Sequence, residues 1–295
     1  MRPSVGVMRS ATDELLLERA FAALPMLGSS SRWRVTALPG GIANRSWLLA
    51  APDCKLTLRI PLRDTGELGV DRAGERAAME VAANAGLAPE LLYFNVATGL
   101  MLSKYLDGRT WEQADAHDPS SVVRLADRLR RLHALKPPAD ARRLEYPALI
   151  ASYRRILAAR GDPPPRASAP LDEKADRLLA GLAASGHPRA LCHNDLHHRN
   201  IVDGKSFWLI DWEYAASGDR MYDLASFACY HDLDAGERSQ LLEAYAPDVA
   251  TTLARSFDDY CWLFAYLHLL WLEITASTGK SAATEIAVRF AKLQG

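Results

Sequence analysis

The sequence predicts an α+β fold in two parts, a small antiparallel β-sheet followed by a mainly helical region. Three short segments with strand-like composition stand between residues 33 and 60 and are separated by turn residues. Beyond residue 108, apolar residues recur at helical spacing over most of the chain. A run of strands followed by a run of helices is the pattern of an α+β protein.

The N-terminal part, residues 1–105, is expected to contain two helices and one sheet. Residues 14–24 carry apolar side chains at helical intervals, with Thr12 or Asp13 available as the cap. A second helix is expected over residues 72–85, and Gly86 ends it. The expected strands are residues 33–38, 46–50, 55–60, 91–94 and 100–105. We place a hinge at about residues 102–108, where the pattern changes to helical.

The C-terminal part, residues 106–295, is expected to be the larger and mainly helical lobe. Asp118 before Pro119 is a good helix start, and further helices are expected over residues 147–159 and 172–184. The proline-rich residues 161–170 between them predict an exposed linker within one domain. Gly204 provides the turn of a short hairpin whose second strand is the apolar run 207–210.

Composition limits the class of partner. The chain has 295 residues, of which 49% are hydrophobic and 24% charged, with a net charge of −1. This balance gives no general attraction to nucleic acid or to an anionic membrane, so we expect a small-molecule partner and neither of those two. A monomer and a homodimer both remain open.

The cysteines and the apolar runs predict a cytoplasmic protein. Four cysteines are scattered without the C-x-x-C spacing of redox or metal sites, which is typical of reduced thiols. The N-terminus lacks the apolar core of a signal peptide, and the longest apolar run, residues 261–272, is too short to span a bilayer.

Four polar residues stand at the spacing that phosphoryl transfer to a hydroxyl requires. His193, Asp195 and Asn200 form a His-x-Asp-x-x-x-x-Asn pattern, and Asp211 follows the apolar strand. A carboxylate at Asp195 can hold the attacking hydroxyl and accept its proton. Oxygens of Asn200 and Asp211 suit Mg²⁺, which neutralises a triphosphate.

These residues resemble the aminoglycoside phosphotransferase and choline kinase superfamily, in particular its choline/ethanolamine and thiamine kinase branch. The resemblance includes the segments at residues 38–47, 58–61, 71–75, 86–94 and 210–215, and so covers roughly residues 35 to 230. It implies a bilobal, protein-kinase-like fold that uses ATP and Mg²⁺. It also implies transfer of the γ-phosphoryl group to a small, cationic alcohol, with Asp195 as the base, His193 as support of its loop, and Asn200 and Asp211 as metal ligands.

The expected nucleotide site is made by a loop, a strand, a helix and the hinge. Arg59 stands where kinases usually place a phosphate-binding lysine, with Lys55 as a second candidate. Glu75 fits the family pattern for its helix partner, and Glu80 is the runner-up. The remaining expected contacts are Gly40, Gly41, Asn44, Arg45 and Ser46 in the loop over the phosphates, and Ser103, Lys104, Tyr105 and Leu106 in the hinge at the adenine.

The expected acceptor site is acidic and aromatic. Glu213 lies two residues after Asp211 and either offers a negative charge to a cationic substrate or pairs with an arginine. An aromatic stripe over residues 260–271 is mainly core, yet one face of it suits a cation by cation–π attraction. The aromatic candidates are Trp212, Tyr214, Trp262, Tyr266 and Trp271.

Several alternatives stay open at this level. The acceptor can instead be an aminoglycoside or a sugar, and a catalytically silent ligand-binding protein would keep the same motifs. Asp223 either braces the catalytic loop or caps a helix. We expect His197 and His198 to contact solvent or local backbone, and we expect no zinc site.

Overall fold

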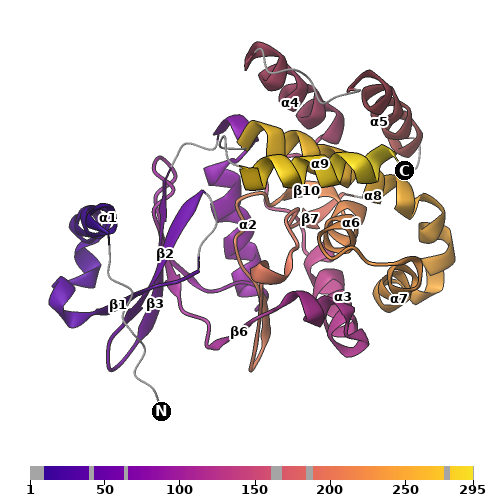
Figure 1. The fold of residues 1–295 in the computed structure, drawn as a ribbon. Helices are drawn as coiled ribbons and strands as arrows, with labels where there is room; N and C mark the ends of the chain where they lie inside the picture. The colour runs from indigo at the N-terminus through magenta and orange to yellow at the C-terminus, as the bar shows by residue number, and fades with distance from the viewer. Residues whose placement is uncertain are drawn as a thin grey trace.

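A computed structural model describes residues 10–39, 43–62, 66–160, 168–183, 189–275 and 280–294. Figure 1 shows a β-sheet with one flanking helix on one side of the molecule and a group of helices on the other. The α+β fold with an antiparallel N-terminal sheet and a helical C-terminal region is therefore confirmed. Among the described helices, none is both long and apolar enough to cross a membrane.

The N-terminal sheet has five strands in the order β1-β2-β3-β5-β4, and every neighbouring pair is antiparallel. Its strands are β1 Arg34–Ala37, β2 Asn44–Ala50, β3 Lys55–Pro61, β4 Leu91–Phe94 and β5 Met101–Lys104. Helix α1 spans Ala11–Ala23, and Ser10 caps it by accepting from the Asp13 N–H, one turn earlier than the expected Thr12 or Asp13 cap. Helix α2 spans Arg72–Asn84, with Asp71 as its cap.

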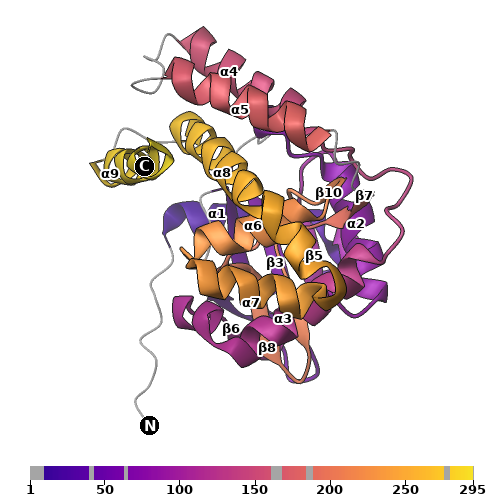
Figure 2. The same ribbon diagram turned by 90° about the vertical axis from the view of Figure 1, so that its right-hand side faces the viewer.

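The C-terminal region is built mainly from helices, with α8 running through its centre and α4 and α5 packed along its outer side (Figure 2). These helices are α3 Pro119–His133, α4 Tyr146–Arg160, α5 Ser168–Ala183, α6 Met221–Tyr230, α7 Ala235–Tyr245, α8 Ala250–Thr275 and α9 Lys280–Gln294. Short 3-10 turns occur at Pro25–Leu27, Ser30–Arg32, Gly66–Leu68, Gln113–His117, His198–Asn200 and Pro247–Val249. Most of the expected linker at residues 161–170 falls outside the described residues.

Two small antiparallel sheets carry the loops between these helices. The first pairs β7 (Arg189–Cys192) with β10 (Ala216–Asp219). The second has the order β6-β8-β9, with bounds Gly108–Thr110, Ile201–Gly204 and Phe207–Leu209. Strand β6 was not expected, because its three residues are exposed and give no apolar alternation. Its first residue, Gly108, is the last of the stretch expected as the hinge, and it pairs with Gly204 of β8 in the β8–β9 hairpin.

The apolar core falls into two clusters. One lies between α1 and the N-terminal sheet and includes Trp47, Leu49 and Leu58. The other fills the helical region, and the buried face of α2, with Ala78 and Met79, belongs to it. The N–H of Leu209 in β9 also donates to the carbonyl of Leu87, just after α2, at 2.8 Å. Helix α2 is thus packed on the helical region although in sequence it lies between β3 and β4 of the sheet.

Candidate active site

The loop after β7 carries His193, Asn194 and Asp195, and its backbone needs a left-handed turn. Asn194 has φ of 64°, a conformation that asparagine tolerates better than most residues. Its side chain is held at both ends, because its amide donates to the Tyr214 carbonyl at 3.0 Å and its oxygen accepts from the Tyr146 hydroxyl at 2.8 Å. The turn brings Asp195 to the wall of a cavity.

Asp223 holds this loop in place from helix α6. Its carboxylate accepts from the backbone N–H groups of His193 at 2.9 Å and Asn194 at 2.6 Å. Asp223 lies inside α6, whose N-cap residue is Arg220, and the first N–H of the helix, that of Met221, donates to Asp219 at 3.0 Å. Of the two roles considered for Asp223, the structure therefore has the brace and not the cap.

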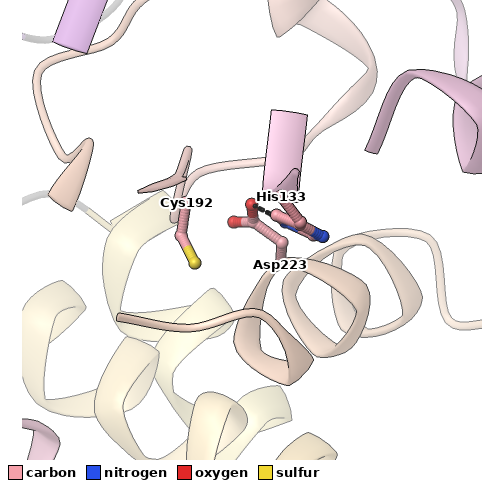
Figure 3. Close-up of side chains that lie close together, drawn as sticks. All are labelled: His133, Cys192 and Asp223. Atoms are coloured by element: carbon pink, nitrogen blue, oxygen red, sulfur yellow. Dashed lines mark hydrogen bonds and ion pairs between the residues drawn. The ribbon is translucent and has the colours of Figure 1, made fainter. Parts of the chain in front are cut away.

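Asp223 is also part of a buried group with His133 and Cys192 (Figure 3). Their ligand atoms lie within 4.8 Å of one another, a spacing that a metal ion can use. The carboxylate, however, already accepts from His133 Nε2 at 3.0 Å and from two backbone N–H groups. Burial raises the pKa of the Cys192 thiol well above its usual value, so it stays protonated. The group therefore supports the loop and is not a metal site.

His193 is buried behind the loop. Its Nε2 donates to the carbonyl of Ile210 at 2.9 Å, and its ring meets Trp212 edge to face at 4.9 Å. Burial lowers its pKa, so the imidazole is neutral and acts as a bridge between the loop and the strand before Asp211.

Both oxygens of Asp195 accept a hydrogen bond. Oδ1 accepts from the Tyr230 hydroxyl at 2.8 Å, and Oδ2 accepts from Nδ2 of Asn200 at 3.0 Å. Burial raises the pKa of Asp195 because a low dielectric disfavours its charged form. A carboxyl with a raised pKa is a stronger proton acceptor when it is ionised.

Asp211 and Glu213 are two further acidic residues at the same cavity. Asp211 follows β9 with φ of 63°, which turns its carboxylate toward Arg59 Nη1 at 3.4 Å. Burial raises the pKa of Asp211 to about 6 and that of Glu213 to about 7. Glu213 Oε2 accepts from the Asn44 amide at 3.0 Å, which joins β2 to the C-terminal region.

Arg59 of strand β3 pairs with Glu75 of helix α2. Nη2 of Arg59 lies 2.5 Å from Oε1 of Glu75, and Arg72 lies 2.7 Å from the other oxygen of the same carboxylate. Arg59 and Glu75 are 4% and 0% exposed, whereas the alternatives Lys55 and Glu80 form exposed pairs with Asp107 and Arg76. The buried pair is therefore Arg59 with Glu75.

These residues meet at one cavity of about 1020 Å³. Its sheet side is lined by Asn44, Ser46, Arg59, Ser103, Lys104, Tyr105 and Leu106, together with Asn200, Asp211 and Glu213. Its helical side is lined by Tyr214, Tyr230, Phe264, His268, Trp271, Glu285 and Arg289. Asp195 lies on the wall of the same cavity, which is large enough for two small molecules at once.

Residues 34–256 match the phosphotransferase enzyme family, which is more than half of the chain. The chain belongs to this family. A probable choline kinase 3 from Arabidopsis thaliana is 25% identical over 66% of this chain and 59% of its own length. Thiamine kinase from Salmonella heidelberg is 32% identical over 55% of this chain and 53% of its own length. The matched part thus spans little more than half of these relatives.

A solved structure extends the likeness to almost the whole chain. The choline/ethanolamine kinase family protein from Mesorhizobium loti is 28% identical, with a TM-score of 0.78. The alignment covers 96% of this chain and 93% of that one. The phosphotransferase described here therefore has the protein-kinase-like fold of the choline/ethanolamine kinases.

Most of the residues expected in the site line the cavity, and a few do not. His193 and Glu75 are fully buried and are not part of the cavity lining. Arg45 is exposed and lies 3.7 Å from Asp13, away from the cavity. Trp262 and Tyr266 stack on each other at 5.6 Å on the face of α8 that meets Lys174 and Asp172 of α5, outside the cavity lining. Gly40 and Gly41 lie outside the described residues.

Of the helical-side residues named above, sequence reasoning did not assign five to the site, namely Tyr230, Phe264, His268, Glu285 and Arg289. Tyr230 had a usable signal, because it follows Asp223 by two helical turns and so shares its face of α6. Phe264 and His268 are one turn apart on α8, on the face that also holds Trp271. His197 lines the cavity too, with its Nε2 3.7 Å from Asp195 Oδ2, in addition to the expected backbone contact.

The donor set fits a Mg²⁺ ion. The Asp211 side chain is one-third exposed, at 33%, and lines the cavity. Asn200 turns its amide nitrogen toward Asp195, so the amide oxygen is the atom left for a metal. Carboxylate and amide oxygens are hard ligands of the kind Mg²⁺ prefers.

Proposed function

We propose that this phosphotransferase transfers the γ-phosphoryl group of ATP to the hydroxyl of a small, cationic alcohol of the choline, ethanolamine or thiamine kind. One observation carries the proposal. Asp195, Asn200, Asp211 and Arg59, which is held from behind by Glu75, line a single cavity whose opposite side is aromatic. This arrangement has a base, oxygen ligands for a metal and a cation for phosphate, all facing the space of two substrates.

The proposed reaction is a direct transfer. The acceptor oxygen forms a bond to the γ-phosphorus while the bond from that phosphorus to the β,γ-bridging oxygen breaks. The hydroxyl proton passes to Asp195, and ADP leaves with the bridging oxygen. Tyr230 and Asn200 hold the two oxygens of Asp195 during this step, so the base keeps one orientation.

The nucleotide would lie on the sheet side of the cavity. Arg59 is fixed by Glu75 and suits the phosphates, and the hinge residues Ser103 to Leu106 suit the adenine. Asn200 and Asp211 would hold Mg²⁺, which when bound neutralises charge on the phosphates.

The acceptor would lie on the helical side. Tyr214, Tyr230 and Trp271 offer aromatic faces there, and cation–π attraction of about 1–2 kcal/mol favours a cationic group beside them. Glu285 adds a negative charge at the same end.

A second acceptor class is supported by one residue. Arg289 of α9 also lines the helical side, and its charge opposes a cationic substrate. Its contacts to Glu285 at 3.9 Å and to the Cys229 carbonyl at 3.4 Å are long, which leaves it able to bind an oxygen-rich acceptor such as a sugar.

A panel of acceptors separates these candidates. Mg²⁺-ATP turnover is measured with choline, ethanolamine, thiamine, amino sugars, neutral sugars and aminoglycosides, and the phosphorylated product is identified. Turnover with a cationic alcohol supports the proposal, and turnover with neutral sugars alone supports the second class. Nucleotide binding with no phosphorylated product from any acceptor would show a silent ligand-binding protein.

Replacing the base tests the chemistry itself. Asp195→Ala is expected to lower the rate of phosphoryl transfer by at least about 100-fold, because the hydroxyl loses its proton acceptor. Binding of Mg²⁺-ATP, measured by calorimetry, should persist. Asp258→Ala is the control, because Asp258 is exposed and neither it nor its partner Arg238 lines the cavity. Full activity in Asp195→Ala would sink the assignment.

We also place the enzyme in the cytoplasm. Cys54, Cys192, Cys229 and Cys261 are all unpaired in the structure, which suits a reducing compartment.

A further inference from the structure

Tyr230 touches both the base and the aromatic side of the cavity. It is the last residue of α6, and its hydroxyl donates to Asp195 Oδ1 at 2.8 Å. Its ring meets Phe264 at 5.4 Å and His268 at 5.0 Å, both edge to face. Phe264 and His268 line the side of the cavity assigned to the acceptor. Tyr230 is therefore the direct connection between the base and that wall.

The hydrogen bond from Tyr230 fixes a side chain that otherwise has freedom to rotate. The terminal torsion of aspartate is broad, so an unrestrained carboxylate samples many orientations. With Tyr230 on Oδ1 and Asn200 on Oδ2, rotation of the Asp195 carboxylate breaks two hydrogen bonds at once. Orientation matters here, because a misplacement of about 1 Å costs on the order of 100-fold in rate.

Tyr230 is built to donate a hydrogen bond and not to exchange its proton. Burial holds the pKa of its hydroxyl well above the usual value, so the proton remains on the phenol. The ring is also packed on a third side by His197 of the catalytic loop, at 5.4 Å and edge to face. These contacts fix where the hydroxyl points.

We propose that Tyr230 is a positioning residue, which orients the Asp195 carboxylate toward the acceptor hydroxyl and couples that orientation to the packing of Phe264 and His268. The inference rests on the proposed kinase function. It assigns to Tyr230 an effect on the catalytic step that passes only through Asp195.

Removing the hydroxyl tests this role with little change in shape. Tyr230→Phe is expected to lower kcat about tenfold, while the KM for Mg²⁺-ATP stays within about twofold, because the nucleotide lies on the other side of the cavity. Tyr260→Phe is the matched control. Tyr260 is fully buried and donates a hydrogen bond of 2.5 Å to Asp219, away from the base, so its kcat should stay within about twofold of the wild type.

A double-mutant cycle separates positioning from general loss of structure. In an Asp195→Ala background, Tyr230→Phe should change the residual rate by less than about twofold, since the group through which it acts is gone. A further tenfold fall in that background, or an unchanged kcat for Tyr230→Phe alone, would overturn the inference. Thermal unfolding of Tyr230→Phe and Tyr260→Phe shows whether the two losses of stability are alike.

The cycle is measured with choline and thiamine as acceptors. If neither is phosphorylated, it is measured on hydrolysis of Mg²⁺-ATP, in which water takes the place of the acceptor hydroxyl. A wild-type chain that shows neither reaction removes the proposed function and this inference together. A wild-type chain that is active and gives an additive cycle removes this inference alone.

Discussion

The two sides of the cavity are built from different chemistry. On the sheet side, charged groups are paired with one another, as in the chain of contacts from Asp211 to Arg59 to Glu75. On the helical side, aromatic rings and a neutral histidine predominate, as in the contacts between Tyr230, Phe264 and His268. Charge suits a polyphosphate that every acceptor shares, whereas aromatic faces suit the acceptor itself.

The two sides of the cavity also differ in the effect that a mutation has on stability. A buried ion pair that loses one member leaves an unpaired charge, which is strongly unfavourable. An aromatic wall that loses one ring keeps the rest of its packing. We therefore expect mutations on the sheet side to act mainly on stability and nucleotide binding, and those on the helical side mainly on the acceptor.

The largest effect is expected at Glu75. Glu75→Ala should lower the free energy of unfolding by about 3–5 kcal/mol, because it leaves Arg59 buried without its partner. Denaturant unfolding measures the change. Glu80→Ala on the same helix is the control, since Glu80 is exposed and its change should stay within about 0.5 kcal/mol. Equal effects of the two variants would contradict the contrast between a buried pair and a surface pair.

The next largest effect is a pH dependence of the free energy of unfolding that comes from His268 on the helical side. Burial lowers the pKa of His268 to about 3, below the value of about 6.5 expected in the unfolded chain. Between these values the unfolded state binds more protons, so the free energy of unfolding falls as the pH falls below about 6.5. For one histidine the loss reaches about 2 kcal/mol at pH 5.

His268→Gln isolates this contribution. The variant should lose less stability than the wild type between pH 7.5 and pH 5, by about the same 2 kcal/mol, because glutamine has no proton to gain. Denaturant unfolding at both pH values gives the comparison, and the difference between the two proteins removes the effect of the other titrating groups. Parallel losses in the two proteins would show that His268 is not held neutral by burial.

The smallest effect is expected from one aromatic ring. Trp271→Ala should raise the KM for a cationic acceptor about tenfold, because one cation–π face of roughly 1–2 kcal/mol is lost, with the KM for Mg²⁺-ATP unchanged. Trp262→Ala is the control. Trp262 lies on α8 as well, but it stacks on Tyr266 outside the cavity. A raised acceptor KM in Trp262→Ala alone would reverse the assignment of the two faces of α8.

More of the sheet side of the cavity than of the helical side could be predicted from the sequence, for a physical reason. Asp195, Asn200 and Asp211 are close in sequence, and one loop with one hairpin fixes their relative positions. Arg59 and Glu75 are each set by a local motif. Tyr230 and His268, in contrast, are brought to Asp195 by the packing of α6 against α8, which depends on the register of two helices.

The same reason explains the differences in the fold. Strands β1 to β5 and helix α2 follow from local periodicity and turn residues, and their bounds differ from expectation by at most two residues. Strand β6 depends on its partner β8, almost one hundred residues later, and its own residues give no signal. Which face of α8 meets the cavity likewise depends on how α8 packs against the neighbouring helices α4, α5, α6, α7 and α9.

The membership of α2 in the helical cluster affects how this chain can be divided for protein engineering. A fragment that stops at residue 105 would keep α2 but expose its Ala78 and Met79 face, and it would leave the Leu87 carbonyl without the Leu209 N–H. A chimaera that exchanges this fragment between two members of the family has the same problem at the same surface. Strands β1 to β3 and α1 share their apolar cluster with Leu102 of β5, so an exchange that stops before α2 splits that cluster and the pairing of β3 with β5. A cut on either side of α2 therefore breaks buried contacts.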